Sequence, residues 1–211
     1  MLNRYARAAA TRILTPLAKL LIRLGLSPDA VTILGTIGVC LGAWVFFPQG
    51  ELLIGVLVIT AFVFSDTLDG VMARLLGRTS KWGAFLDSTL DRVGDAAIFS
   101  GLAIWFFQGG DDRVMAWLAM GALILGSVVS YARARAEGLG MTASVGIAER
   151  ADRLVVALVT TGLVGLGLPE IVLKVVLAVL VVASAVTVMQ RVLFVRQQCL
   201  AAEADAANPT P

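Results

Sequence analysis

The strongest constraint on the fold is a series of apolar segments that are each about long enough to cross a bilayer. Six of them lie at about residues 30–47, 52–75, 83–107, 114–136, 153–168 and 170–194, and a helix of about 20 residues spans the hydrocarbon core. Because lipid offers the backbone no hydrogen-bond partner, each segment must form a helix. The composition agrees, since 58% of the residues are hydrophobic and 15% are charged, against about 25% charged in soluble domains. The sequence therefore predicts an all-α polytopic membrane protein with six transmembrane helices.

The two ends of the chain are predicted to lie outside this six-helix domain of residues 27–198. Residues 1–26 mix Leu and Ile with Arg and Lys throughout, which predicts a juxtamembrane amphipathic helix. Residues 199–211 are Ala-rich and contain two prolines, which predicts a disordered tail. Lys and Arg gather at both ends and in the loops after the second and fourth segments, whereas the opposite loops hold only Arg113 and Lys174. Both termini are therefore expected on the cytoplasmic side.

Four aspartates interrupt this apolar pattern. Asp66 and Asp69 are three residues apart near the end of the second segment, and Asp87 and Asp91 are four apart near the start of the third. Each pair lies on one face of its helix. Each charge in a membrane segment costs about 2.5–3.5 kcal/mol, so a bound cation is expected to offset them. An all-carboxylate site suits Mg²⁺ or Mn²⁺, and two such ions can assist phosphoryl transfer.

The residues around the aspartates form a longer pattern. Residues 66–91 read DTLDGVMAR, eight further residues, and GAFLDSTLD. This resembles the signature of the CDP-alcohol phosphotransferase family, DxxDGxxAR(x)8GxxxDxxxD, at all eight fixed positions. Residues 27–32, SPDAVT, resemble the family's NPNxxT entry to the first helix, with Ser and Asp in place of both Asn. The resemblance implies an enzyme in which an alcohol attacks the phosphorus of a CDP-activated lipid and CMP leaves.

The resemblance also implies roles for individual residues. The metal ligands would be Asp66, Asp69, Asp87 and Asp91. Asp91 would in addition be the catalytic base that accepts the proton of the acceptor hydroxyl. The residues that face the CDP group would be Pro28, Thr32, Asp69, Gly70, Ala73, Arg74, Arg78, Thr79, Ser80 and Gly83.

The acceptor is expected to bind to arginines near the cytoplasmic face. The run YARARAEG at 131–138 and GIAERADR at 146–153 resembles the actinobacterial phosphatidylinositol phosphate synthases, a group within this family. Their substrates would be CDP-diacylglycerol and inositol 1-phosphate, with the acceptor phosphate bound by Arg133, Arg153 and Arg191. A phosphatidylglycerophosphate synthase, which uses glycerol 3-phosphate, is the alternative. The resemblance further implies a homodimer in a bacterial cell membrane with a cytoplasmic active site, in contact with membrane lipids and with no nucleic-acid partner.

Other charged residues have simpler interpretations. Asp95 is expected to be structural and to pair with Arg92, since an unpaired arginine in a membrane helix is expensive. The alternative is that Asp95 supports the metal ligands from behind. Arg135 and Arg150 are expected to contact lipid headgroups. A cation transporter would also carry buried carboxylates. Release of CMP from CDP-diacylglycerol distinguishes the enzyme from the transporter.

Overall fold

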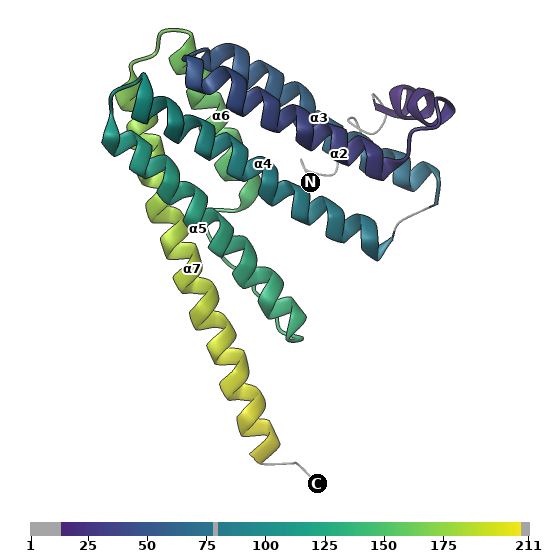
Figure 1. The fold of residues 1–211 in the computed structure, drawn as a ribbon. Helices are drawn as coiled ribbons and strands as arrows, with labels where there is room; N and C mark the ends of the chain where they lie inside the picture. Colours follow the sequence, from purple (N-terminus) through teal and green to yellow (C-terminus); the bar gives the residue numbers. More distant parts are fainter. Residues whose placement is uncertain (1–13, 78–79, 208–211) are drawn as a thin grey trace.

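The computed structural model describes residues 14–77 and 80–207, without the side chains of Asp66 and of residues 204–207. Across these ranges the chain is helical and contains no strand (Figure 1). Residues 14–23 are helical, while the first half of the surface helix predicted for residues 1–26 lies outside the described residues. Its position at the membrane surface stays a prediction. The further elements are α2 (Pro28–Leu41), a π-helical turn (Gly42–Phe46), a 3-10 turn (Phe47–Gln49), α3 (Leu52–Leu75), α4 (Lys81–Gln108), α5 (Arg113–Gly138), α6 (Arg150–Gly165) and α7 (Glu170–Ala207).

The helices pack as two groups that α4 and α6 connect. Helix α2 packs against α3 and α4, while α5 packs against α4 and α7, and α6 contacts both α3 and α7 (Figure 1). The core between them is rich in alanine, including the fully buried Ala43, Ala116 and Ala119. Small side chains allow membrane helices to approach closely. A Cβ on Gly101 would lie 2.7 Å from the Ala43 carbonyl oxygen, so the π-helical turn after α2 and helix α4 are in contact there through their backbones.

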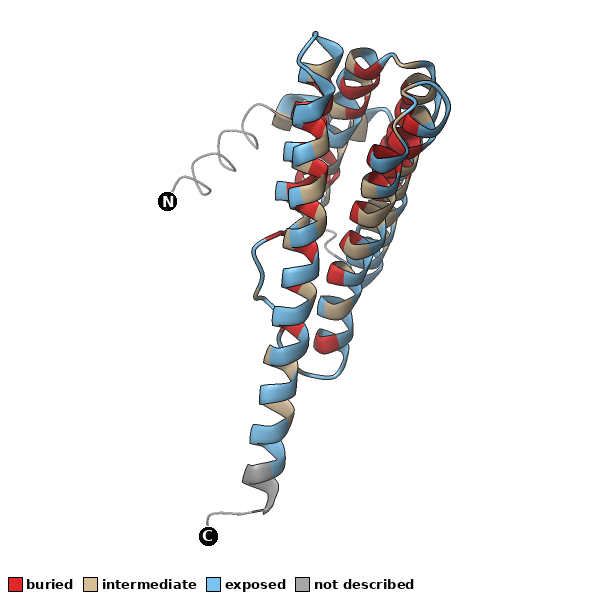
Figure 2. Cartoon of the chain, turned by 90° about the vertical axis from the view of Figure 1, so that its left-hand side faces the viewer, coloured by how far each residue is buried: buried red, intermediate tan, exposed pale blue. Residues whose placement is uncertain are grey.

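The outer surface of the bundle is apolar, as expected for helices that face lipid. Leu57, Trp117 and Val182 are each more than 60% exposed, and exposed positions run along the outward faces of the helices (Figure 2). Among the described residues, four helical stretches are long and apolar enough to cross a membrane: Pro28–Gln49, Leu52–Leu75, Arg113–Gly138 and Glu170–Glu203. The fold is thus that of an all-helical protein with four candidate membrane spans.

The remaining two predicted segments, 83–107 and 153–168, coincide with α4 and α6. Helix α4 carries Asp87, Asp91, Arg92 and Asp95 in its first half. Helix α6 has 16 residues, which at 1.5 Å per residue is shorter than the ~30 Å of a hydrocarbon core. Length and composition alone therefore mark four crossings, and the six-crossing topology belongs to the proposal below.

The prediction of a disordered tail from residue 199 is wrong for its first part. Helix α7 continues through Ala207, and residues 208–211 lie outside the described residues. The extension is rich in Ala, which has the highest intrinsic helix propensity and can continue a helix that packing has already nucleated. It projects beyond the bundle (Figure 1).

Candidate active site

A cavity of about 560 Å³ opens among the start of α2, the end of α3 and the start of α4. Its volume is within the range of small-molecule sites. Most of the residues predicted to face CDP line it: Pro28, Thr32, Asp69, Gly70, Ala73, Ser80 and Gly83. Ser27, Asp29, Ala84 and Asp87 complete the lining. The structure therefore brings together three segments that are up to 60 residues apart in the sequence.

Helix caps place two of these segments. Ser27 caps α2 by accepting a hydrogen bond from the Ala30 N–H at 3.1 Å. Ser80 caps α4 in the same way, from the Gly83 N–H at 2.9 Å. Serine is a preferred cap because its hydroxyl satisfies a backbone donor that the first turn leaves free. Both helices consequently begin at the cavity, and the positive end of a helix dipole favours anions.

The floor of the cavity has little side-chain bulk. A Cβ added to Gly70 would have only the Arg74 Nη1 atom nearby, at 3.7 Å, so the backbone of α3 is accessible at this point. Arg74 is therefore adjacent to the cavity without lining it. Arg78 and Thr79, which are also predicted to face CDP, lie outside the described residues.

Asp29 was not predicted as a site residue. It lies in the first turn of α2, and one of its carboxylate oxygens accepts a hydrogen bond from Trp82 Nε1 at 3.1 Å. The ring centroid of Trp82 lies 6.0 Å from the ring centroid of Phe85. This contact joins the start of α4 to the start of α2 across the cavity, and the SPDAVT segment is the only sequence signal for it.

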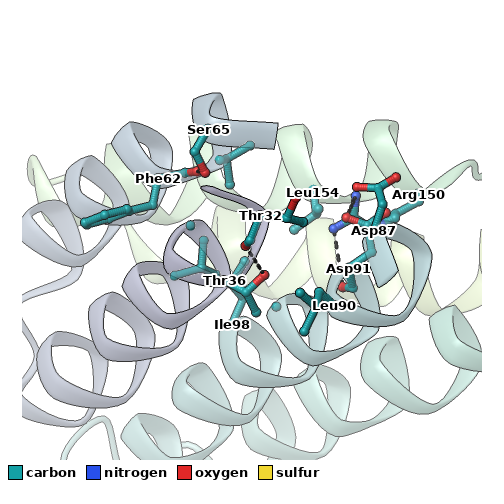
Figure 3. Close-up of a pocket in the computed structure, with 14 residues that line it drawn as sticks. Thr32, Thr36, Phe62, Ser65, Asp87, Leu90, Asp91, Ile98, Arg150 and Leu154 are labelled. Atoms are coloured by element: carbon teal, nitrogen blue, oxygen red, sulfur yellow. Dashed lines mark hydrogen bonds and ion pairs between the residues drawn. The ribbon is translucent and has the colours of Figure 1, made fainter. Parts of the chain in front are cut away.

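The predicted carboxylates come from the two helices that flank the cavity. Asp69 is on α3 and Asp87 is on α4, and both line the large cavity. Asp87 also lines a smaller cavity of about 50 Å³ together with Asp91, one turn further along α4 (Figure 3). Thr32 on α2 donates a hydrogen bond to Asp69 Oδ2. The side chain of Asp66, one turn before Asp69, lies outside the description.

The donor chemistry of this group fits a hard divalent cation, since Asp69, Asp87 and Asp91 offer only carboxylate oxygens. Among the side chains that the structure describes, no three His, Cys, Asp or Glu residues converge into a complete metal-binding group. Asp91 is instead directed to a cation of the protein itself. Its Oδ1 lies 2.9 Å from Arg150 Nη1, and its Oδ2 lies 3.4 Å from Arg92 Nη2.

Arg150 is a second residue that sequence reasoning missed. It was expected to contact lipid headgroups, but at the first position of α6 it reaches across to α4 and pairs with Asp91 (Figure 3). It also pairs with Asp95. The expected pair of Asp95 with Arg92 is also wrong. Asp95 is buried and faces α6, where the Arg150 Nη2 atom is 2.9 Å away, while Arg92 contacts Asp91. No local signal in the sequence could have paired Asp95 with Arg150, because the end of α4, the whole of α5 and an irregular loop lie between them.

The three arginines predicted for the acceptor occupy different environments. Arg153 is 2% exposed and donates to the backbone carbonyls of Ala148 at 2.9 Å and Gly126 at 3.3 Å. Arg191 is 3% exposed and donates to those of Val145 at 2.9 Å and Val129 at 2.6 Å. Both therefore hold the loop of residues 139–149 against the helices.

Arg133, in contrast, is exposed and pairs with Glu137 at 2.9 Å. Arg191 interacts electrostatically with both Arg133 and Arg153. Arg191 also interacts with the acidic Glu137 and Glu149. Of the three arginines, only Arg133 is exposed.

Comparison with known proteins identifies the group to which this site belongs. The family model described as CDP-alcohol phosphatidyltransferase matches residues 25–148, more than half of the sequence. The chain belongs to this family. It is therefore an enzyme of phospholipid synthesis, and the resemblance inferred from the aspartate signature is confirmed. The cation-transporter interpretation is not supported.

Similarity to individual relatives extends over almost the whole chain. The phosphatidylinositol phosphate synthase of Streptomyces avermitilis is 55% identical over 99% of this chain and 87% of its own length. That of Cutibacterium acnes is 49% identical over 92% of this chain and 98% of its own.

Two crystal structures of the Mycobacterium tuberculosis phosphatidylinositol phosphate synthase have the same fold. The structure with CDP-DAG bound superposes with a TM-score of 0.84 and 41% identity, over 87% of this chain and 94% of that one. The structure in complex with manganese and citrate superposes with a TM-score of 0.83 and 40% identity, over 86% and 88%. A divalent metal in this family is thereby supported.

Proposed function

We propose that this enzyme transfers the phosphatidyl group of CDP-diacylglycerol to inositol 1-phosphate, which yields phosphatidylinositol phosphate and CMP. The observation that carries this proposal is the extent of similarity to phosphatidylinositol phosphate synthases. The aspartate signature is common to a family with several acceptors, whereas the match at 55% identity extends over 99% of the chain and so spans the region of the loop of residues 139–149. The acceptor is expected to be recognised in that region.

We place the CDP group in the cavity at the start of α2 and α4. The helices that Ser27 and Ser80 cap begin at this cavity, so the positive ends of their dipoles would be close to the diphosphate, and Gly70 allows close approach to α3. Arg74 supplies positive charge beside this position. The remaining contacts are proposed for Pro28, Thr32, Asp69, Ala73, Arg78, Thr79 and Gly83.

The chemistry requires that charge on the diphosphate is neutralised and that a hydroxyl is deprotonated. Asp66, Asp69, Asp87 and Asp91 would hold two divalent ions, Mg²⁺ or Mn²⁺, which when bound polarise the phosphate oxygens. The carboxylate of Asp91 accepts the proton of the acceptor hydroxyl as the oxygen attacks the phosphorus bonded to the lipid. The new oxygen–phosphorus bond forms, the bond to the CMP oxygen breaks, and CMP leaves with the electron pair.

The acceptor phosphate would bind at Arg133, Arg153 and Arg191. Arg133 is accessible without any rearrangement, because its present partner Glu137 is an exposed neighbour on the same helix. An exposed pair of this kind contributes little free energy and exchanges readily. The buried Arg153 and Arg191 would contribute positive electrostatic potential from the protein interior. Their hydrogen bonds to the carbonyls of Ala148 and Val145 fix the loop of residues 139–149, against which the inositol ring would lie.

The membrane arrangement completes the proposal. We propose six crossings, with both termini and the active site on the cytoplasmic side of a bacterial cell membrane and with membrane lipids around the bundle. In this arrangement Lys174 and Arg113 are the basic residues on the opposite side. The protein is proposed to be a homodimer, which light scattering in detergent would test.

The test uses the full chain purified in detergent with labelled CDP-diacylglycerol and Mg²⁺ or Mn²⁺. Inositol 1-phosphate, free inositol and glycerol 3-phosphate are supplied in separate reactions, and CMP release and lipid product are measured. We expect turnover with inositol 1-phosphate and none after chelation of the metal or in the Asp87→Asn variant. Turnover with glycerol 3-phosphate alone would refute the inositol phosphate assignment and leave the family assignment intact.

A further inference from the structure

Arg150 pairs with two aspartates of α4 through different nitrogens of its guanidinium group. Its Nε lies 3.0 and 3.2 Å from the two carboxylate oxygens of Asp95, and its Nη2 lies 2.9 Å from Asp95 Oδ1. Its Nη1 lies 2.9 Å from Asp91 Oδ1. The guanidinium group is planar and rigid, so Asp95 holds one edge of the fork and the remaining nitrogen is directed at Asp91.

The environment of this pair differs from that of a surface ion pair. Asp95 is 8% exposed, and Arg150 also donates from Nη2 to the backbone carbonyl of Asp91 at 3.3 Å. In such a setting, loss of either partner leaves a buried charge without compensation. The arginine therefore has one stable position, and that position determines where the Asp91 carboxylate can lie.

We infer that Arg150, anchored by Asp95, is a positioning residue that orients the Asp91 carboxylate for catalysis. The inference rests on the proposed function, in which Asp91 is both a metal ligand and the base. Partners that orient metal ligands in this way typically contribute 10–100-fold to metal affinity or activity. Asp95 and Arg150 would thus act on the reaction through Asp91 without contact with either substrate.

A purely structural tie between α4 and α6 is the competing explanation. Such a tie would affect thermal stability but not the turnover of the folded protein. A positioning role would lower kcat and weaken metal binding, while the KM for CDP-diacylglycerol would change little, because the large cavity contains neither Arg150 nor Asp95.

The experiment compares Arg150→Gln, Arg150→Lys, Asp95→Asn and the Arg150→Gln/Asp95→Asn double variant of the full chain in detergent. Arg135→Gln is the matched control, because this substitution removes the same charge from an arginine that is exposed at the end of α5. Steady-state kinetics, Mn²⁺ binding measured by electron paramagnetic resonance without substrates, and thermal unfolding are recorded for each protein.

We expect kcat to fall about 10–100-fold in Arg150→Gln and in Asp95→Asn, with a parallel loss of Mn²⁺ affinity and an unchanged control. The double variant should be no worse than the worse single variant, because both substitutions disrupt one unit. Arg150→Lys should fold but recover only part of the rate, since a single ammonium group cannot hold Asp95 by a fork and also reach Asp91.

Wild-type kcat and Mn²⁺ affinity in a folded Arg150→Gln or Arg150→Lys protein would overturn the inference, as would losses that multiply in the double variant. These outcomes are distinct from failure of the proposed function, in which the wild-type protein itself does not use inositol 1-phosphate. The kinetic comparison is then made with the acceptor that does turn over, and the Mn²⁺ measurement needs no acceptor.

Discussion

The hydrogen bond between Thr32 and Asp69 allows a direct test of the proposed metal site. The Thr32 hydroxyl lies between Asp69 Oδ2 and the Pro28 carbonyl oxygen, which is 3.1 Å away. Thr32→Val removes the hydroxyl and keeps the shape of the side chain. The Asp69 carboxylate then loses a partner on α2 that holds it toward the cavity, and we expect weaker binding of the divalent ion.

The size of the effect follows from the contacts. A hydrogen bond to a charged group contributes about 1.5–3 kcal/mol, and each 1.4 kcal/mol corresponds to a tenfold change in affinity. The hydroxyl also has an alternative acceptor in its own helix, so the lower end of the range applies. We therefore expect metal affinity to fall about tenfold, which agrees with the usual effect of removing a partner of a metal ligand.

The assay is Mn²⁺ binding to the full protein without CDP-diacylglycerol, because Thr32 also lines the nucleotide cavity and its loss could change the KM of the donor. Thr160→Val is the matched control. Thr160 is also a helical threonine, though more buried than Thr32, and its hydroxyl donates to the Val156 carbonyl oxygen at 2.8 Å within α6. Unchanged Mn²⁺ affinity in Thr32→Val, or an equal loss in Thr160→Val, would refute the reasoning.

Two further predictions concern stability. Gly146 has φ +137°, and a Cβ there would lie 2.3 Å from the Thr187 side chain. Thermal unfolding should therefore show that Gly146→Ala destabilises the protein by about 1–3 kcal/mol. Gly138→Ala is the control and should not destabilise it, because no atom lies near the added Cβ. Lys174 donates to Asp112 at 2.6 Å, and this hydrogen bond lowers the pKa of Asp112. A lowered pKa gives stability that is present above the unfolded value of about 4 and is lost as pH falls through the folded value. The melting temperatures of wild type and Lys174→Met should therefore differ at neutral pH and converge in acid; a difference that persists in acid would contradict the assignment.

Much of the fold could be predicted because the apolar segments end at strong breaks. The segment predicted at 52–75 has the bounds of α3, and the one at 114–136 lies within α5. Helix α6 was predicted to reach residue 168 but ends at Gly165, where Leu166 and Gly167 form a turn before Pro169. Hydropathy continues through Leu168, so the pattern could not locate this end.

The cavity that is proposed to hold the CDP group could be predicted for a different reason. The signature lies on two consecutive helices joined by a short loop, so its spacing alone brings Asp69 and Asp87 to one cavity. Arg150 and Asp95 are 55 residues apart and meet across the loop of residues 139–149. Arg92, three residues before Asp95, was the nearer partner in sequence, but the two side chains leave α4 in directions that the packing of α6 decides.

The first turn of α6 connects the two halves of the proposed reaction. Arg150 and Arg153 are three residues apart, so they lie on the same side of one helical turn. Arg150 holds the carboxylate that is proposed to deprotonate the acceptor, while Arg153 holds the loop beside which the acceptor is proposed to lie. In the proposed arrangement, one helical turn of α6 would therefore set the distance between the base and the acceptor. An arginine that touches neither substrate would in this way determine how the Asp91 carboxylate lies relative to the acceptor. Removing the contact between Asp95 and Arg150 should therefore lower turnover more than it weakens binding of CDP-diacylglycerol.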